Sequence, residues 1–259
     1  MYTKQMSQVR PYRSRICRSG QSSGKFLSEF VRDIIKDIGP VKTMIDVGCG
    51  TGKQSDFIKK NFPEIKITGL DFSEATCKFL EKSPIFEKVY YASSASLPVK
   101  DKEFEVALSM ENLEHLYYED VQNAMEELKR VSNIIILTTP NPNGVIDTRW
   151  LEDEIIQAGN DKVPMNEHDF MCMTSAVHKS VIYPDSLLEC GFKQVYCKYY
   201  NHSVFYGTSD NLDMSKLRFD GLLKSDELDG DSYLEKYECI LHRSLALRPL
   251  LIKNNTRKI

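Results

Sequence analysis

The sequence lacks the features that mark membrane-spanning, secreted and strongly basic proteins. It has no run of the roughly 18 apolar residues that a membrane helix needs, and its N-terminus lacks the apolar core of a signal peptide. It has no excess of positive charge, because 34 basic residues face 37 acidic ones and the net charge is −3. We therefore expect a cytoplasmic protein with neither a membrane nor a nucleic acid as its partner.

Paired cysteines and internal repeats are missing as well. The cysteines, seven in all, are scattered, and no two of them stand in the CxxC arrangement of zinc and redox sites. Reduced thiols fit this pattern, as in other cytosolic proteins. The 259 residues can bury a good-sized core, and we expect one domain.

Short apolar runs alternate with helical patterns in the first half of the chain. This rhythm predicts an α/β fold in which a mostly parallel sheet is connected by crossover helices. An amphipathic helix over Phe26–Ile38 precedes the sheet and is stopped by Gly39-Pro40. The expected strands are Thr43–Val47, Lys66–Leu70, Lys88–Ala92, Phe104–Ser109 and Asn133–Thr139, and the expected helices are Gly52–Asn61, Glu74–Lys82 and Asp120–Val131.

We expect the domain, residues 1–259, to have four parts. They are an N-terminal tail and helix (1–40), a core (41–143), an insertion or lid (144–182) and a C-terminal completion of the sheet (183–259). In the last part a short helix should end at Gly191, and a strand should follow near Lys193–Tyr200. The polar stretch 201–233 predicts a long excursion between strands, and the apolar run 237–252 should close the sheet.

A glycine-rich loop, DVGCGTG, follows the first expected strand directly. A triphosphate loop is excluded, because Val47 stands where its first glycine should be and Gln54 follows the lysine. The dinucleotide fingerprint is half met, since Gly48 and Gly50 fit but Lys53 stands where the third glycine is needed. Glycines here let a ligand lie against the backbone and permit a positive φ. The helix N-terminus that follows suits an anionic group.

The second expected strand ends in an acidic residue, Asp71, nineteen positions after Gly52. A carboxylate at this place can accept hydrogen bonds from both hydroxyls of an unphosphorylated ribose. Phe72 beside it could cover one face of an adenine ring. The ligand therefore looks like a nucleoside with a small anionic tail.

These stretches resemble the class I S-adenosylmethionine-dependent methyltransferases. The resemblance covers residues 41–143 through IDVGCGTG, GLDFSEA, SASLPVKDKEFEVALSMENLEHL and LKRVSNIIILTTPNPNG, and HKSVIYPDSLLECGF is a further echo. It implies a Rossmann-like doubly wound sheet, mostly parallel with a C-terminal antiparallel strand, and S-adenosylmethionine as the cofactor. Relatives commonly have aspartate where Ser93 stands. The cofactor-binding positions carried over are Asp46, Gly48, Gly50, Gly52, Asp71, Phe72, Ser93, Ser94 and Met110.

The residues with chemistry to offer lie just after the fourth strand. Glu111, Glu114 and His115 would share one face of a helical turn. The pattern resembles the ExxEH of the methyltransferases that modify the terminal ribose of small RNAs, in which the two acids and the histidine bind a divalent metal with a later histidine. The resemblance implies magnesium or manganese, with His178 as the later ligand and His168 in reserve. Similar stretches serve packing, capping or substrate contact in many metal-free relatives.

The catalytic candidates without a metal are His115, His178 and Glu111, because an oxygen or nitrogen acceptor often needs a base. Methyl transfer from a sulfonium otherwise needs mostly alignment. We expect a small-molecule acceptor, such as a metabolite, a phosphorylated compound or a nucleotide-linked sugar, methylated on oxygen. Two alternatives stay open: an RNA ribose 2′-O-methyltransferase, and a non-catalytic or NAD-type nucleotide-binding protein, which Asp71 permits and Lys53 opposes.

Overall fold

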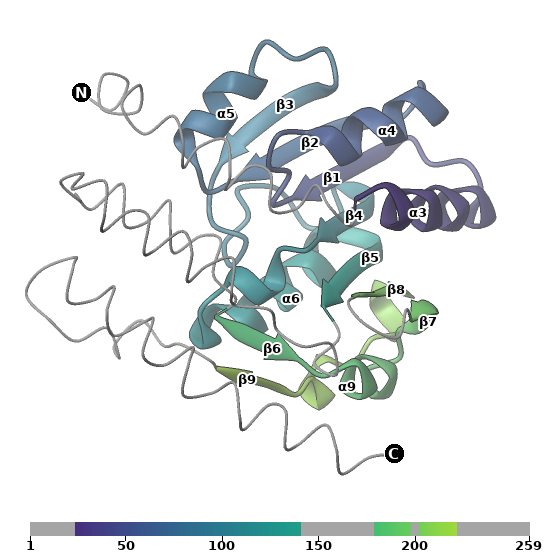
Figure 1. Cartoon of the computed structure of the whole chain (residues 1–259), viewed down its shortest axis with the longest axis vertical. Helices are drawn as coiled ribbons and strands as arrows, with labels where there is room; N and C mark the ends of the chain where they lie inside the picture. The colour runs from purple at the N-terminus through teal and green to yellow at the C-terminus, as the bar shows by residue number, and fades with distance from the viewer. Residues whose placement is uncertain (1–23, 141–178, 198–201, 222–259) are drawn as a thin grey trace, which may run out of the picture.

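The protein is built around one seven-stranded sheet. The computed structural model describes residues 24–140, 179–197 and 202–221 (Figure 1). The strand order is β3-β2-β1-β4-β5-β8-β7, and a separate two-stranded ribbon pairs β6 with β9. The strands of the sheet are β1 (Thr43–Val47), β2 (Lys66–Asp71), β3 (Phe86–Tyr91), β4 (Phe104–Met110), β5 (Ser132–Pro140), β7 (Lys193–Cys197) and β8 (His202–Thr208); the ribbon consists of β6 (Ser180–Ile182) and β9 (Phe219–Gly221).

The sheet is parallel except at β8. The first five strands pair in parallel, whereas β8 runs antiparallel to both of its neighbours, β5 and β7. The chain order reverses between β1 and β4, which are adjacent in the sheet. In open α/β sheets such a switch point, at the carboxyl ends of the strands, is where ligands bind.

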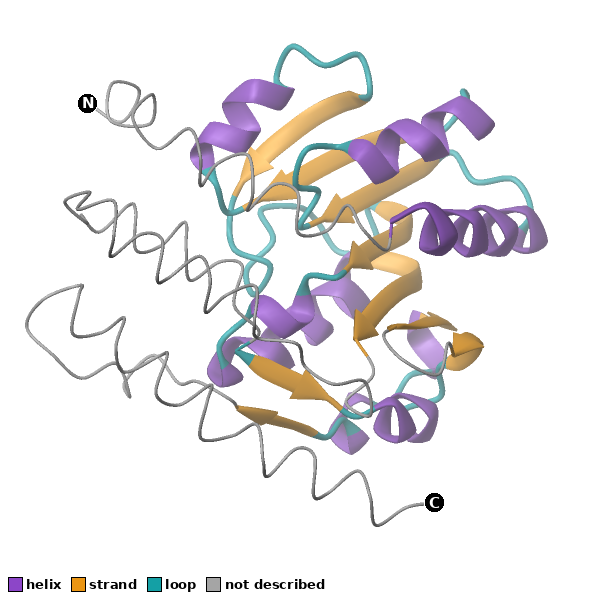
Figure 2. Cartoon of the chain, in the orientation of Figure 1, coloured by secondary structure: helices purple, strands orange, loops and turns teal. Residues whose placement is uncertain are grey.

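Helices cover both faces of the sheet, as Figure 2 shows. One core cluster joins apolar side chains of α3, α4 and α5 to one face, and a second cluster joins those of α6 and α9 to the other. Side chains of each strand therefore alternate between the two cores. The helices are α3 (Gly24–Ile38), α4 (Lys53–Asn61), α5 (Glu74–Leu80), α6 (Tyr118–Val131) and α9 (Pro184–Glu189), and the short 3-10 turns are η1 (Leu113–His115), η2 (Ser209–Asn211) and η3 (Met214–Lys216).

The doubly wound, mostly parallel architecture expected from the sequence is confirmed. Each strand and helix expected between residues 26 and 139 is present, with ends that differ by at most two residues. The short helix before Gly191 and the strand from Lys193 are confirmed too. No helix in the described ranges is long and apolar enough to cross a membrane. The proposed insertion up to residue 178 and the apolar run 237–252 lie outside the described residues.

The expectation that 201–233 forms a polar excursion is wrong for its described part. Residues 202–208 form β8, which lies between β5 and β7 inside the sheet. The reason is that small residues occupy buried positions there: Ser203 is fully buried, and Gly207 leaves room for Leu212 and Phe192. A buried strand with so few apolar residues does not show the continuous apolar run that marks such strands.

Phe205 provides the main apolar anchor of β8, because its side chain is fully buried in the core beneath α6 and α9. We expect Phe205→Ala to lower the free energy of unfolding by about 3 to 5 kcal/mol, the usual cost of deleting a buried aromatic ring. Val195→Ala on the neighbouring edge strand, where the side chain is 42% exposed, should cost far less. Urea unfolding of the two variants measures both values, and a cost for Phe205→Ala no larger than that for Val195→Ala would contradict this placement of β8.

Candidate functional site

The glycine loop makes the turn from β1 into α4 with left-handed backbone at three positions. Gly48, Gly50 and Gly52 have φ values of 78°, 52° and 77°. The backbone N–H groups of Gly48 and Cys49 both donate to the carbonyl of Leu70, at 2.8 and 2.9 Å, which fixes the loop against β2. The positive φ expected from the sequence is confirmed, and side chains at these positions would strain the backbone.

The three glycines face different surroundings. A Cβ atom on Gly48 would lie 2.4 Å from Oδ1 of Asn112, and one on Gly52 would lie 2.9 Å from the ring of Phe86. A Cβ on Gly50 would meet no atom of the described residues within 4 Å. The loop is thus packed at both ends and open in the middle, beside the first N–H groups of α4, which precede its helical hydrogen bonds.

Asp71 stands at the open part of this loop. Its Oδ2 accepts from the N–H of Gly50 at 2.9 Å, and its Oδ1 accepts from the N–H of Ser73 at 2.8 Å. Burial raises the pKa of this carboxyl, and the two N–H donors oppose that rise. Each carboxylate oxygen can accept more than one hydrogen bond, so both keep capacity for a ligand.

The loop that follows β3 reaches the same edge of the sheet. Ser94 is buried and its hydroxyl accepts from Nδ2 of Asn112 at 3.2 Å, whereas Ser93 is exposed and its hydroxyl accepts from the N–H of Ala95 at 3.1 Å. Phe72, at the start of the turn after β2, is 45% exposed and is available to a flat ligand. Met110 ends β4 as a buried core residue.

Asn112 is a site residue that the sequence did not single out. Its side chain contacts the position above Gly48 and donates to the hydroxyls of Ser94 and Ser109, at 3.2 and 3.3 Å. It therefore joins the ends of three different strands. Its position in the sequence could have indicated this role, because Asn112 stands in ENLEH, directly after the fourth strand at the switch point.

Asp46 lies deeper, inside β1. Its side chain is 3% exposed, and its Oδ2 accepts from the hydroxyl of Ser55 at 2.6 Å. Burial raises the pKa of Asp46 to about 6; the Ser55 hydroxyl opposes this rise, and the charge of Asp71 adds to it. Cys49 is a buried thiol whose pKa burial raises well above its ordinary value, so it is a packing residue as expected.

Glu111 follows β4 in a backbone conformation that non-glycine residues rarely adopt. Its φ is 48°, and its N–H donates to both the carbonyl and the hydroxyl of Thr138, at 3.2 and 3.1 Å. The same hydroxyl donates to Oε1 of Glu111 at 2.7 Å. Such strained residues persist only where their surroundings hold them, and they gather at functional sites.

The helical face expected for Glu111, Glu114 and His115 is not formed as predicted. The left-handed backbone at Glu111 breaks the turn, and a 3-10 helix begins only at Leu113. Glu114 and His115 lie on that helix, with 4.0 Å between Oε1 and Nε2. Within residues 24–140, 179–197 and 202–221, no group of three His, Cys, Asp or Glu side chains is arranged to hold a metal ion.

Glu114 is the most unusual carboxyl of this region. It is 2% exposed, and neither of its oxygens has a hydrogen-bond partner within the described part of the chain. Burial raises its pKa well above the ordinary value, and the nearby charge of Glu111 adds to the effect. Burying a carboxyl that lacks hydrogen bonds costs stability, so such a group calls for an explanation, for example a ligand that would satisfy it.

The start of β6 holds the η1 turn in place through three successive carbonyls. The N–H of Lys179 donates to the carbonyl of Glu114 at 2.7 Å, and its Nζ donates to that of His115 at 2.9 Å. The hydroxyl of Ser180 donates to the carbonyl of Leu116 at 2.8 Å. Burial lowers the pKa of Lys179 to about 7. The two later histidines, His168 and His178, lie outside the described residues.

The buried carboxyl of Asp46 makes stability depend on pH. Its pKa is higher in the folded state than the ordinary 3.8, so the fold binds the proton more tightly and loses stability as pH rises from about 4 to 6. We expect Asp46→Asn to abolish this loss and to stabilise the protein at pH 7 by up to about 3 kcal/mol, at 1.36 kcal/mol per pKa unit. At pH 4 the variant and the parent should be equally stable.

Urea unfolding at pH 4 and pH 7 measures this difference. Asp37→Asn is the matched control, because that side chain is exposed on α3 and its removal should leave the parent's pH profile unchanged. A profile for Asp46→Asn that parallels the parent's would show that Asp46 is not the residue responsible.

Comparisons with known proteins bear on the same part of the chain. Residues 45–133 match the family described as "Methyltransferase domain". An uncharacterized protein of Methanocaldococcus jannaschii is 27% identical over 161 residues, which cover 60% of this chain and 59% of that protein. A demethylmenaquinone methyltransferase of Thermotoga maritima is 28% identical over 120 residues, which cover 44% of this chain and 50% of that one.

The match to these two relatives thus spans between half and three fifths of their own length. Among solved structures, the plantazolicin methyltransferase BpumL in complex with a triazolic desmethylPZN analog and SAH is similar at 20% identity and a TM-score of 0.44, covering 66% of this chain and 64% of that one. The family match coincides with the glycine loop, with Asp71 and with the turn that follows β4. Residues 45–133 are therefore similar to methyltransferase domains, and they lie within a sheet of the doubly wound, mostly parallel order.

Proposed function

We propose that the chain is an S-adenosylmethionine-dependent methyltransferase that methylates an oxygen of a small metabolite, a phosphorylated compound or a nucleotide-linked sugar. The observation that carries the proposal is the open glycine loop: a Cβ on Gly50 would meet no atom of the described residues within 4 Å, and the carboxylate of Asp71 stands beside it. This space fits a ligand that lies against the backbone, and the family match supports the cofactor.

The residues of the site fit the parts of this cofactor. We assign its methionine end to the glycine loop and the N-terminus of α4, its ribose to Asp71, and its adenine to Phe72, Ser93, Ser94 and Met110. When bound, the cofactor supplies a methyl group on a positively charged sulfur that leaves as a neutral thioether. The protein must then align the acceptor and exclude water, which needs little covalent help.

The acceptor side is assigned to the turn after β4. An acceptor hydroxyl must lose its proton as the methyl group arrives, and the candidate bases are His115, Glu111 and His178. The hydroxyl of Thr138 donates to Oε1 of Glu111 and so fixes this carboxyl at the end of β4, where it can orient the acceptor. A basic residue of this kind helps an oxygen acceptor more than an amine.

A second candidate function is the methylation of an RNA ribose, favoured by Glu111, Glu114 and His115 in the ExxEH order. Labelled S-adenosylmethionine offered with pools of small hydroxylated metabolites and, separately, with short RNAs decides between the two. Label in the metabolite pool alone supports the proposal. Label in RNA alone would replace it with the second candidate.

Asp71 provides the sharpest test of the cofactor assignment. We expect Asp71→Asn to weaken binding of S-adenosylhomocysteine about 10- to 100-fold, because a charged hydrogen-bond acceptor for the ribose is lost. Glu64→Gln, an exposed carboxyl in the turn before β2, is the matched control and should bind as the parent does. Calorimetry measures both. Preferential binding of NAD or ATP by the parent would end the methyltransferase proposal.

We further propose that Glu114 contributes to a divalent metal site with Glu111, His115 and His178. The support is the buried carboxyl of Glu114, whose oxygens have no hydrogen-bond partner among the described residues and would suit the oxygen-binding cations magnesium and manganese. The described residues alone do not complete such a site. The proposal therefore depends on His178 as well.

Manganese binding tests this assignment directly, because free Mn²⁺ has an electron paramagnetic resonance signal that falls when the ion is bound. We expect the parent to bind Mn²⁺ and Glu114→Gln and His178→Ala to bind it at least tenfold more weakly, as two ligands contribute separately. Glu189→Gln, an exposed carboxyl on α9, serves as the control. Equal binding by all four proteins would remove the metal from the proposal.

A further inference from the structure

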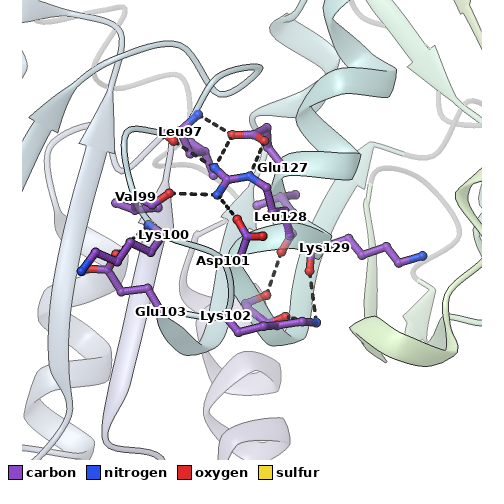
Figure 3. A network of polar contacts seen from close by, with 11 residues as sticks. Leu97, Val99, Lys100, Asp101, Lys102, Glu103, Glu127, Leu128 and Lys129 are labelled. Carbon is purple, nitrogen blue, oxygen red and sulfur yellow. Dashed lines mark hydrogen bonds and ion pairs between the residues drawn. The ribbon is translucent and has the colours of Figure 1, made fainter.

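The connection from β3 to β4 crosses one face of the sheet without a helix. Residues 92–103 begin at the ligand edge, where Ser93 and Ser94 lie, and end at the opposite edge, where β4 starts. A stretch without helical hydrogen bonds must have its backbone groups satisfied by other partners. In this protein many of those partners come from α6, as Figure 3 shows.

Two side chains of α6 hold the middle of this connection. The guanidinium of Arg130 donates to the carbonyls of Leu97 and Val99, at 3.0 and 2.9 Å, and to the carboxylate of Asp101 at 2.7 Å. The carboxylate of Glu127 accepts from the N–H of Leu97 at 2.6 Å. We call this set of bonds the Arg130 clasp.

The two α6 side chains of the clasp, Arg130 and Glu127, also bind each other. Arg130 donates to both oxygens of Glu127, at 2.7 and 2.8 Å, in the two-pronged geometry that only arginine offers a carboxylate. The hydrogen bond from Arg130 lowers the pKa of Glu127, and Glu127 in turn raises the pKa of Arg130, so both stay charged at neutral pH. The side chain of Glu127 is 19% exposed and that of Arg130 is 30% exposed. The side chain of Asp101 is 79% exposed, so its ion pair with Arg130 contributes little stability.

The Arg130 clasp begins at Leu97, three residues after Ser94, which lies at the ligand edge. At that edge the N–H of Ala92 donates to the carbonyl of Asp71 at 3.1 Å, and Asn112 donates to the hydroxyl of Ser94. The backbone is therefore fixed on both sides of Ser93 to Ser96. Its place at the ligand edge is set jointly by the strand ends and by the Arg130 clasp.

We infer that Arg130 and Glu127 are positioning residues for recognition of the nucleobase. They touch no ligand themselves, and they hold the backbone at Leu97 and Val99 so that Ser93 and Ser94 stay at a fixed distance from Asp71. The inference rests on the proposed function, because it takes the nucleobase to lie against this turn. It predicts that removing hydrogen bonds of the clasp lowers the selectivity between nucleobases more than it lowers the affinity for the rest of the nucleoside.

The test compares two nucleoside thioethers that differ at the base. S-adenosylhomocysteine carries a 6-amino group, and S-inosyl-L-homocysteine carries an oxygen there. We expect the intact protein to prefer the adenosyl compound and Arg130→Met to reduce that preference about 3- to 10-fold, the worth of one well-placed hydrogen bond. Arg130→Lys should keep part of the preference, because lysine reaches one carbonyl but lacks the fork.

Lys129→Met is the matched control. Lys129 lies on the same helix, and its Nζ donates to the carbonyl of Leu212 at 2.7 Å, away from the connection. We expect Lys129→Met to lose about as much thermal stability as Arg130→Met and to keep the preference of the intact protein for the adenosyl compound. If Arg130→Met fails to fold, Glu127→Gln and Arg130→Lys serve in its place, since each leaves part of the clasp intact.

The outcomes separate the clasp from the proposed function. Failure of the intact protein to bind either compound refutes the proposed function. Binding of both by the intact protein with equal affinity, or a preference that survives in Arg130→Met and Glu127→Gln, overturns the inference while leaving the proposed function standing. Faster hydrogen exchange of the peptide that spans residues 93–101 in Arg130→Met, with no such change in Lys129→Met, supports it from a readout that needs no ligand.

Discussion

The site depends first on how one residue, Asp71, joins three separate segments of backbone. Its carboxylate binds the N–H groups of Gly50 and Ser73, and its carbonyl accepts from Ala92. The glycine loop, the start of α5 and the connection after β3 therefore share one anchor. Because these bonds form within the protein, they hold the three segments in place without a ligand, and a ligand beside Asp71 would need little reorganisation of the backbone.

The two sides of the switch point differ in how well their polar groups are satisfied. On the side of β1, β2 and β3, the carboxyls of Asp46 and Asp71 both accept hydrogen bonds, and Asn112 connects this side to the end of β4. On the side of β4 and β5, Glu114 and the hydroxyl of Thr139 are buried without hydrogen-bond partners among the described residues. The polar groups of the first side are thus better satisfied within the described part of the chain than those of the second.

The sequence predicted what depends on local pattern and missed what depends on contacts between distant strands. The left-handed glycines and the parallel order follow from turn chemistry and from the alternation of strands and helices. The break at Glu111 does not, because Thr138 of β5 holds that backbone. Nor does the role of Asn112, which arises only where β1, β3 and β4 end together. The strand β8 was missed because Ser203 and Gly207 fill its buried positions.

Residues around the turn after β4 offset the loss of stability that its buried and strained groups cause. Glu114 is buried without hydrogen bonds from the described residues, and Glu111 holds a strained φ of 48°, so each lowers the stability of the turn after β4. Lys179 and Ser180 offset this by donating to three successive carbonyls of that turn. Because these bonds restrict how far the turn can relax, they also limit the access of water to Glu114. The turn therefore holds a buried carboxyl at the switch point, the place where open α/β sheets bind their ligands.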